Sequence, residues 1–239
     1  MDLSTQTPFH WSSDFASNTT EFPVTNGNSS QNHQKQFFNE KKQTLSKMDK
    51  SVKGEIDAPI VPLVEMINAS DQYYTTSSCS GRIIVTASSG DQEIGGPVVK
   101  KGTDWQFVSH DPIDDVDQFV KTFGEAVLKG HNSMIIKFEP VIFHIRASDI
   151  ESARTLLQVG LQSGFRNSVI VLASKGRATV AFRSTAAMEV PLVIDGDLVV
   201  GEEYLRQLVK VANRKMVANM QAIVRLQTAM ERFLQISKP

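Results

Sequence analysis

The chain has 239 residues, of which 41% are hydrophobic, and its 25 basic side chains nearly balance 26 acidic ones. This composition supports one sizeable buried core, and no apolar run is long enough to cross a membrane as a helix. A single cysteine excludes an intrachain disulfide and a cysteine-based metal cluster, and it is typical of a reducing compartment such as the cytoplasm.

Residues 1–36 are polar and contain few residues that could form a core. Nineteen of them are Ser, Thr, Asn or Gln, and the first basic residue is Lys35. Such a segment buries too little apolar surface to offset the entropy lost on ordering, so it is predicted to be a disordered polar leader. It also lacks the arginines and the apolar stretch of a targeting segment. Residues 37–239 are predicted to form a single domain.

Beyond the leader, short β-rich runs alternate with runs of helical period. Strands are predicted at 82–87, 105–110, 135–138, 141–147, 168–173, 178–183 and 190–194. Helices are predicted at 37–48, from Pro62 to about 70, at 114–129, from Asp149 to Gln162, and from Glu202 to about Gln235.

The order of these elements predicts the class of fold. Pairs of strands precede each later helix, which favours an α+β fold with a mixed, largely antiparallel sheet, helices packed on it and a long C-terminal helix. The dipeptide Glu139-Pro140 is predicted to be a hairpin turn between two of the strands. No strand runs into a glycine-rich phosphate turn, so a Rossmann-type methyltransferase fold is not expected.

The run from Tyr73 to Val85 changes from hydroxyl-rich to β-branched residues. Its second half is predicted to be a strand. Its first half is too rich in Ser and Thr for a core, so it is predicted to be a loop that brings polar groups to the strand's entrance. These groups are the side chains of Ser78, Cys79, Ser80 and Arg82.

Within this run, Ser77-Ser78-Cys79-Ser80-Gly81-Arg82-Ile83 resembles the characteristic run of the tRNA wybutosine-synthesizing protein 3 family. Further runs in the same order strengthen the resemblance, although Lys101-Gly102-Thr103-Asp104 departs from the tighter glycine pair expected there. These runs are Lys50-Ser51 with Lys53-Gly54, Trp105 with Phe107-Val108-Ser109-His110-Asp111, Lys137-Phe138-Glu139-Pro140, Gly164-Phe165-Arg166-Asn167-Ser168, and Arg183-Ser184-Thr185 with Glu189-Val190-Pro191-Leu192.

The resemblance implies an activity that composition does not show. Members of this family use S-adenosyl-L-methionine to methylate the tricyclic, guanosine-derived base beside the anticodon of phenylalanine tRNA. For this chain the implied step is N4 methylation of 7-aminocarboxypropyl-demethylwyosine. The implied partners are the anticodon loop of that tRNA and other wybutosine-pathway enzymes. From the residues themselves neither a membrane nor a metal is expected, because no apolar run is long enough to span a bilayer and the histidines lack metal-ligand spacing. The runner-up is an RNA-binding accessory protein without chemistry.

The site residues follow from the matched runs. His110 and Glu139 are the candidate catalytic residues, because methylation of a base nitrogen needs an acceptor for a proton and a held donor. Ser78, Cys79, Ser80, Arg82, Arg166, Asn167 and Ser168 are candidates for donor binding, and Trp105, Arg183 and Ser184 for binding the splayed base and its RNA.

Each candidate also has an ordinary structural explanation. Trp105 fits a half-buried strand, His110 fits a turn, and surface arginines are common. His144 is interpreted as a sheet histidine. Cys79 lacks the supported histidine of a cysteine nucleophile, so a packed thiol is favoured over a hydrolase.

The final helix places its bases on one side and its apolar residues on the other. Lys210 and Arg214, together with Arg206, Arg225 and Arg232, form the basic side. Such a face is either a solvated helix surface or a track for tRNA phosphates. Lys210 and Arg214 are therefore candidates for RNA binding.

Overall fold

A computed structural model describes residues 27–46, 55–88, 103–127 and 130–236. Seven strands form one sheet in which every pairing is antiparallel, with the order β2-β1-β3-β5-β4 and with β6 joining β3 to β7. The predicted α+β class with a largely antiparallel sheet is confirmed. The strands are β1 (Tyr73–Ser88), β2 (Thr103–Ser109), β3 (Ser133–Ala147), β4 (Val169–Ala173), β5 (Arg177–Arg183), β6 (Met188–Ile194) and β7 (Asp197–Leu198).

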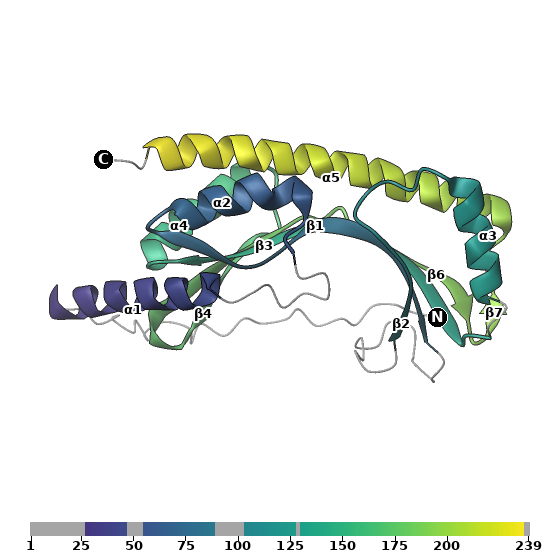
Figure 1. Cartoon of the computed structure of the whole chain (residues 1–239), viewed down its shortest axis with the longest axis horizontal. Coiled ribbons are helices and arrows are strands. Elements are labelled where there is room, and N and C mark those ends of the chain that lie inside the picture. The colour runs from purple at the N-terminus through teal and green to yellow at the C-terminus, as the bar shows by residue number, and fades with distance from the viewer. Residues whose placement is uncertain (1–26, 47–54, 89–102, 128–129, 237–239) are drawn as a thin grey trace, which may run out of the picture.

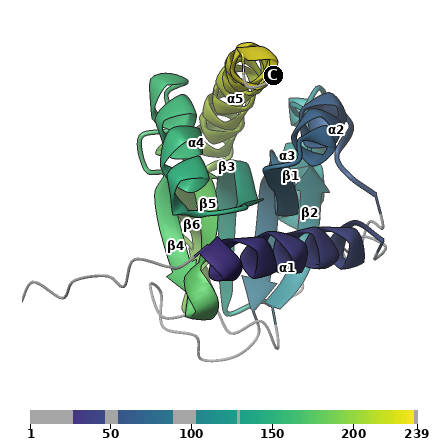
Figure 2. The ribbon, with the colours of Figure 1, turned by 90° about the vertical axis from the view of Figure 1, so that its left-hand side faces the viewer.

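Helices lie on both faces of this sheet, but unequally. Figure 1 shows α5 running along the length of the molecule over one face, with α2, α3 and α4 on the same side. Figure 2 shows α1 across the opposite side. The helices are α1 (Gly27–Leu45), α2 (Val61–Ala69, after a 3₁₀ turn at Ala58–Ile60), α3 (Val116–Val127), α4 (Ile150–Gln162) and α5 (Glu202–Ile236).

Local chemistry explains several helix boundaries. Pro62 lies in the first turn of α2, where its missing N–H costs nothing. Asp149 caps α4 by accepting a hydrogen bond from Ser152 N at 2.7 Å, and Gly164 follows the helix with φ +96°. These boundaries match the prediction. In contrast, α1 begins at Gly27 and not at residue 37, so residues 27–36 belong to a helix, while the rest of the predicted leader, 1–26, lies outside the described residues.

Two strands correct the sequence prediction. The Ser- and Thr-rich run from Tyr73 to Ser80 is not a loop, because it pairs with β3 and forms the first half of one long strand. Glu139-Pro140 is not a hairpin turn, because β3 continues through it. At Pro140 the strand pairs with β1 alone, since β6 pairs only up to Phe138 and β5 only from Ile142. A proline, which has no N–H to donate, is tolerated at such a gap in the ladder.

The interior divides into two apolar clusters that share α5. Core A includes Tyr73, Phe143 and Leu226 and joins α2 and α4 to one half of the sheet. Core B includes Phe138 and Val209 and joins α3 to the other half. We call the residues between the cores, Gly81, Glu139, Pro140 and Asn219, the seam. Side chains that face α5 along β3 switch from even to odd numbers at the seam, from Phe138 to Val141.

Side chains alternate between the two faces of each strand. Ile83 and Phe138 face α5 in core B, so their neighbours Arg82 and Glu139 point to the face turned away from α5, which we call the distal face. Tyr74 likewise points away from core A and packs on Phe37 of α1, with ring centroids 5.3 Å apart. The seam therefore has a helix-covered side and a distal side, and both carry polar groups.

Candidate functional site

Gly81 is a residue of the seam at which there is no room for a side chain. Its φ is +96°, and a Cβ there would lie 2.8 Å from Asn219 Nδ2 and 3.0 Å from the carbonyl oxygen of Glu139. A side chain would therefore meet backbone and a buried amide at once. Glycine lets β1 approach both β3 and α5 at the one place where the two cores are separated.

Asn219 closes the helix-covered side of the seam. Its Nδ2 donates to Ser80 O at 2.7 Å, and its Oδ1 accepts from Val141 N at 2.8 Å. The side chain is only 4% exposed, so both backbone groups would be buried without a partner if it were absent. Sequence reasoning missed Asn219, because in the helical pattern it is one polar residue among apolar ones.

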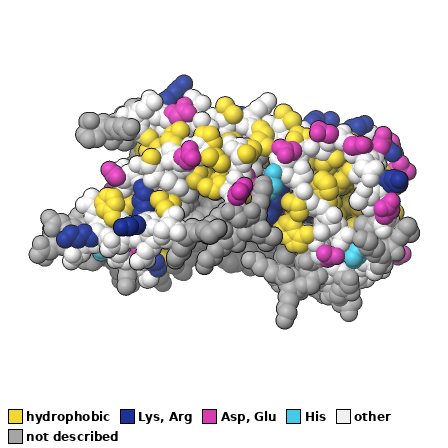
Figure 3. Space-filling model, in the orientation of Figure 1, with side chains coloured by type: hydrophobic (Ala, Val, Ile, Leu, Met, Phe, Trp, Pro, Cys, Tyr) yellow, Lys and Arg dark blue, Asp and Glu magenta, His cyan; other side chains and the backbone are white. Residues whose placement is uncertain are grey.

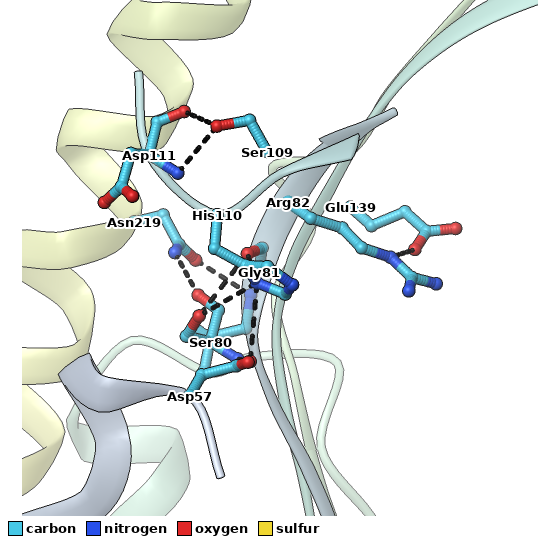
Figure 4. Close-up of polar contacts among 10 residues, drawn as sticks. Asp57, Ser80, Gly81, Arg82, Ser109, His110, Asp111, Glu139 and Asn219 are labelled. Atoms are coloured by element: carbon cyan, nitrogen blue, oxygen red, sulfur yellow. Dashed lines mark hydrogen bonds and ion pairs between the residues drawn. The ribbon is translucent and has the colours of Figure 1, made fainter. Parts of the chain in front are cut away.

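Below Asn219, three side chains meet around the backbone of β1 (Figure 4). Asp57 Oδ2 accepts from Ser80 N at 2.8 Å and lies 3.4 Å from His110 Nδ1. His110 Nδ1 also lies 2.9 Å from Gly81 O, and because a carbonyl only accepts, Nδ1 carries the hydrogen. In the neutral ring the lone pair is then on Nε2. We call Asp57, Ser80 and His110 the histidine cluster.

Asp57 was also missed by sequence reasoning. It lies 23 residues before Ser80 in the chain, and no motif links the two. A buried carboxylate is stabilised only where hydrogen bonds or opposite charge compensate for lost water. Ser80 N–H and His110 provide this compensation, so Asp57 holds the imidazole in an orientation in which Nε2 has no hydrogen bond to the described residues.

Cys79 connects the histidine cluster to the distal face. Its Sγ, a ring nitrogen of His110 and a carboxylate oxygen of Asp57 lie within 4.8 Å of one another, which is a spacing that could hold a metal ion. Burial raises the pKa of the Cys79 thiol, and the negative charge of Asp57 adds to that rise. Asp57 and His110 already take part in hydrogen bonds, so the three side chains are arranged around the imidazole. Because its pKa is raised, the Cys79 thiol remains protonated at neutral pH.

On the distal side of the seam lies a hollow of about 430 Å³. Arg82 Nε and Glu139 Oε2 form an ion pair of 2.7 Å at its wall, and the Arg82 guanidinium lies 4.8 Å from the centre of the Trp105 ring. Figure 4 shows Arg82 and Glu139 pointing away from α5. The hollow is lined by Cys79, Arg82, Glu139, Pro140, Val141, Ile142, Arg183, Ser184 and Ala187.

The structure brings most of the sequence candidates to this region. Five of them line the hollow: Cys79, Arg82, Glu139, Arg183 and Ser184. Trp105 packs against Arg82 and is 49% exposed, so it is not a core tryptophan. Ser80 and His110 belong to the histidine cluster on the other side of Cys79.

Other candidates lie outside the hollow's lining. Ser168 is buried, where its Oγ donates to Phe165 O at 2.6 Å and accepts from Arg183 N at 3.3 Å, so it fixes the end of β5. Arg166 and Asn167 are exposed on the preceding turn. Ser78 lies opposite Phe143 in the ladder between β1 and β3.

The basic residues of α5 lie on its outer surface. Lys210 and Arg214 are exposed, whereas Leu208, Ala212 and Met216 are buried in core B, so the sheet separates the two bases from the hollow. Arg206 forms ion pairs with Asp117 and Glu202 and is not a free cation. Figure 3 shows acidic and basic side chains interspersed along this part of the surface. Phosphate binding by Lys210 and Arg214 therefore stays a prediction, separate from the hollow.

No helix in the described part of the chain is long and apolar enough to cross a membrane. The antiparallel sheet, the long covering helix and the polar seam define an α+β protein outside the Rossmann class. The same fold is found in the PH1069 protein of Pyrococcus horikoshii, with a TM-score of 0.69 and 30% identity over 83% of this chain and 97% of that one. A protein from Aeropyrum pernix at 24% identity shares the fold with a TM-score of 0.59.

The sequence comparisons identify the family. The chain belongs to the Methyltransferase TYW3 family, whose model matches residues 39–232. It is 40% identical over 202 residues to the human tRNA wybutosine-synthesizing protein 3 homolog, covering 82% of this chain and 74% of that protein. It is 38% identical over 200 residues to the bovine protein of the same name, covering 84% of this chain and 74% of that protein. The methyltransferase class expected from the matched runs is confirmed.

Proposed function

We propose that the chain transfers a methyl group from S-adenosyl-L-methionine to N4 of 7-aminocarboxypropyl-demethylwyosine beside the anticodon of cytoplasmic phenylalanine tRNA. The observation that carries this proposal is the seam, where a histidine with a free ring nitrogen lies next to a hollow with opposite charges. The methyltransferase family and the names of the relatives support the substrate class.

His110 is the proposed proton acceptor. When the base nitrogen forms its bond to the methyl carbon, its N–H proton must leave, and Nε2 of His110 takes it while Nδ1 keeps its hydrogen on Gly81 O. Asp57, 3.4 Å from Nδ1, stabilises the imidazolium that results. Asp57 is a positioning residue in this scheme, since it acts through His110.

The hollow is the proposed site of the methyl donor. When bound, S-adenosyl-L-methionine would supply an electrophilic methyl group on a sulfonium centre, whose sulfur keeps the electron pair of the broken carbon–sulfur bond and leaves as a neutral thioether. The residues present fit such a molecule, because Arg82, Glu139 and Arg183 offer both signs of charge around about 430 Å³. Exposed Trp105, held by Arg82, offers a flat face on which a base extruded from the anticodon loop can stack.

The test is methylation of phenylalanine tRNA that carries the tricyclic precursor, with isotopically labelled methyl donor. We expect incorporation by the wild-type chain, a fall in kcat of roughly 10²- to 10⁴-fold for His110→Gln, and unchanged donor binding in that variant. Arg177→Gln is the control, because Arg177 is an exposed arginine at the far end of β5. Binding of tRNA without any affinity for the donor would instead indicate a non-catalytic accessory protein.

Asp57→Asn tests the positioning role separately. The amide still accepts from Ser80 N–H but removes the negative charge beside His110. We expect a folded variant with reduced kcat and unchanged KM for tRNA and unchanged donor binding. A purely structural role would reduce stability and lower kcat and ligand binding together.

A further inference from the structure

The charges in the hollow are not balanced. Arg82 is compensated by Glu139 at 2.7 Å and is further occupied by its contact with Trp105. Arg183, at the end of β5, is exposed and forms no ion pair with any acidic side chain among the described residues. The hollow therefore carries one guanidinium that is free to bind an anion.

The surroundings of Arg183 keep this guanidinium available. Its backbone N–H donates to Ser168 Oγ at 3.3 Å, which fixes the strand end beneath it. His144, on the same face, has its pKa lowered by burial and by the positive charge of Arg183, so it is neutral at neutral pH. Ser184 Oγ accepts from Ala186 N at 3.1 Å, and within the described ranges its O–H has no acceptor, so it can donate to a ligand beside Arg183.

Glu139 presents the opposite charge to the same space. Its Oε2 holds Arg82, and its side chain is 42% exposed. Its second oxygen, Oε1, has no hydrogen bond within the described ranges and is free to accept from a ligand. The hollow thus offers a cation with a hydroxyl donor at Arg183 and Ser184, and a carboxylate oxygen at Glu139.

We propose that the hollow binds an α-amino-acid group, with its carboxylate on Arg183 and Ser184 and its ammonium on Glu139. A planar guanidinium matches a carboxylate in two parallel hydrogen bonds. A phosphate would also satisfy Arg183, but it would place further negative charge against Glu139. Only a group that carries both a negative and a positive charge can bind to Arg183 and to Glu139 at the same time.

This inference rests on the proposed function, because two molecules of that reaction carry the same group. One is the methionyl end of the donor, and the other is the aminocarboxypropyl side chain of the tricyclic base. Both present an ammonium and a carboxylate on one carbon, so the geometry is common to them. The assignment to one or the other depends on which ligand loses affinity when Arg183 is changed.

Calorimetry of the full chain distinguishes the sources with two pairs of probes. S-adenosylhomocysteine carries the amino-acid group, and 5′-methylthioadenosine lacks it. Phenylalanine tRNA with the aminocarboxypropyl group is compared with tRNA that has the tricyclic base alone. The variants are Arg183→Gln and Glu139→Gln, with Arg177→Gln as the matched control on the same strand.

If the donor supplies the group, both variants should weaken S-adenosylhomocysteine binding by roughly 10- to 100-fold and leave 5′-methylthioadenosine unchanged. If the base supplies it, both variants should lose the wild-type preference between the two tRNAs. Either result supports the inference. Wild-type binding of all four probes by both variants, or equal weakening of both tRNAs alone, would overturn it. Failure of the wild-type chain to bind donor analogue or to methylate tRNA would overturn the proposed function instead.

Discussion

The seam and the two cores on either side of it differ in the kind of side chain that they bury. Cores A and B bury aliphatic and aromatic side chains, as in most sheets covered by helices. The seam lies between them and buries Asn219, with Ser80 and Asp57 of the histidine cluster alongside, each held by hydrogen bonds. The difference shows that the fold buries hydrogen-bonded polar groups where apolar residues could have continued the two cores.

The largest effect expected from this comparison is at Gly81. Gly81→Ala should lower the free energy of unfolding by about 3–5 kcal/mol, from backbone strain at positive φ and from displacement of Asn219 and β3. Gly164→Ala is the matched control, because Gly164 has the same φ of +96° with open space around it. It should lose only about 1–2 kcal/mol. Equal losses in urea unfolding would show that the seam is not tightly packed.

Asn219 is the next test of the seam. Asn219→Ala should cost about 2–4 kcal/mol, since Ser80 O and Val141 N would both be buried without a partner. Asn213, six residues earlier on α5, likewise makes two hydrogen bonds to backbone groups, both of Ile113, but it is half-buried. Asn213→Ala should cost about 1 kcal/mol, because water can replace the amide. Thermal or urea unfolding of the two variants compares them directly, and a larger loss at Asn213 would contradict the assignment of the seam.

Outside the seam, stability depends on ordinary local devices. Burial acts to raise the pKa of Asp149, but hydrogen bonds from Ser152 and Ser148 outweigh it, so the pKa lies below its usual 3.8. The carboxylate is therefore protonated at a lower pH in the native state than in the unfolded chain. Its contribution to stability is complete above pH 3.8 and is lost as the pH falls below that value. Asp149→Ala should cost about 1 kcal/mol at pH 7 and less than that in acid. A cost that is independent of pH would mean that charge plays no part in the cap.

The smallest effect concerns His144 on the distal face. Its native pKa is lowered by burial and by Arg183, whereas the unfolded chain takes up a proton near 6.5. Protonation therefore favours the unfolded state, and stability from this residue is lost as the pH falls below 6.5. His144→Gln should make unfolding stability flatter between pH 7 and 5, as measured by urea titration at several pH values. Arg183→Gln should change the profile in the same direction, and no change in either variant would place Arg183 away from His144.

Local patterns in the sequence were sufficient for a large part of this description. Asp149, Pro62 and Gly164 mark helix ends because their effects act within a few residues. The period of the apolar residues indicated α5, and paired strands indicated the antiparallel class. Five candidates from the matched runs line one hollow, which shows that those runs identify residues that the fold brings together.

The tertiary structure alone decided how those pieces join. Tyr73 to Ser80 forms a strand because β3 supplies a partner along its length, and β3 passes through Pro140 because β5 and β6 leave a gap there. Neither partner is visible from the residues nearby. Asp57 lies 23 residues before Ser80 and Asn219 lies 139 after it, and both contact it. Each makes a hydrogen bond to a backbone group that lacks a partner only once the sheet packs against the helices. The sequence by itself predicted the candidate residues other than Asp57 and Asn219, and the topology of the sheet decided which of them line one hollow.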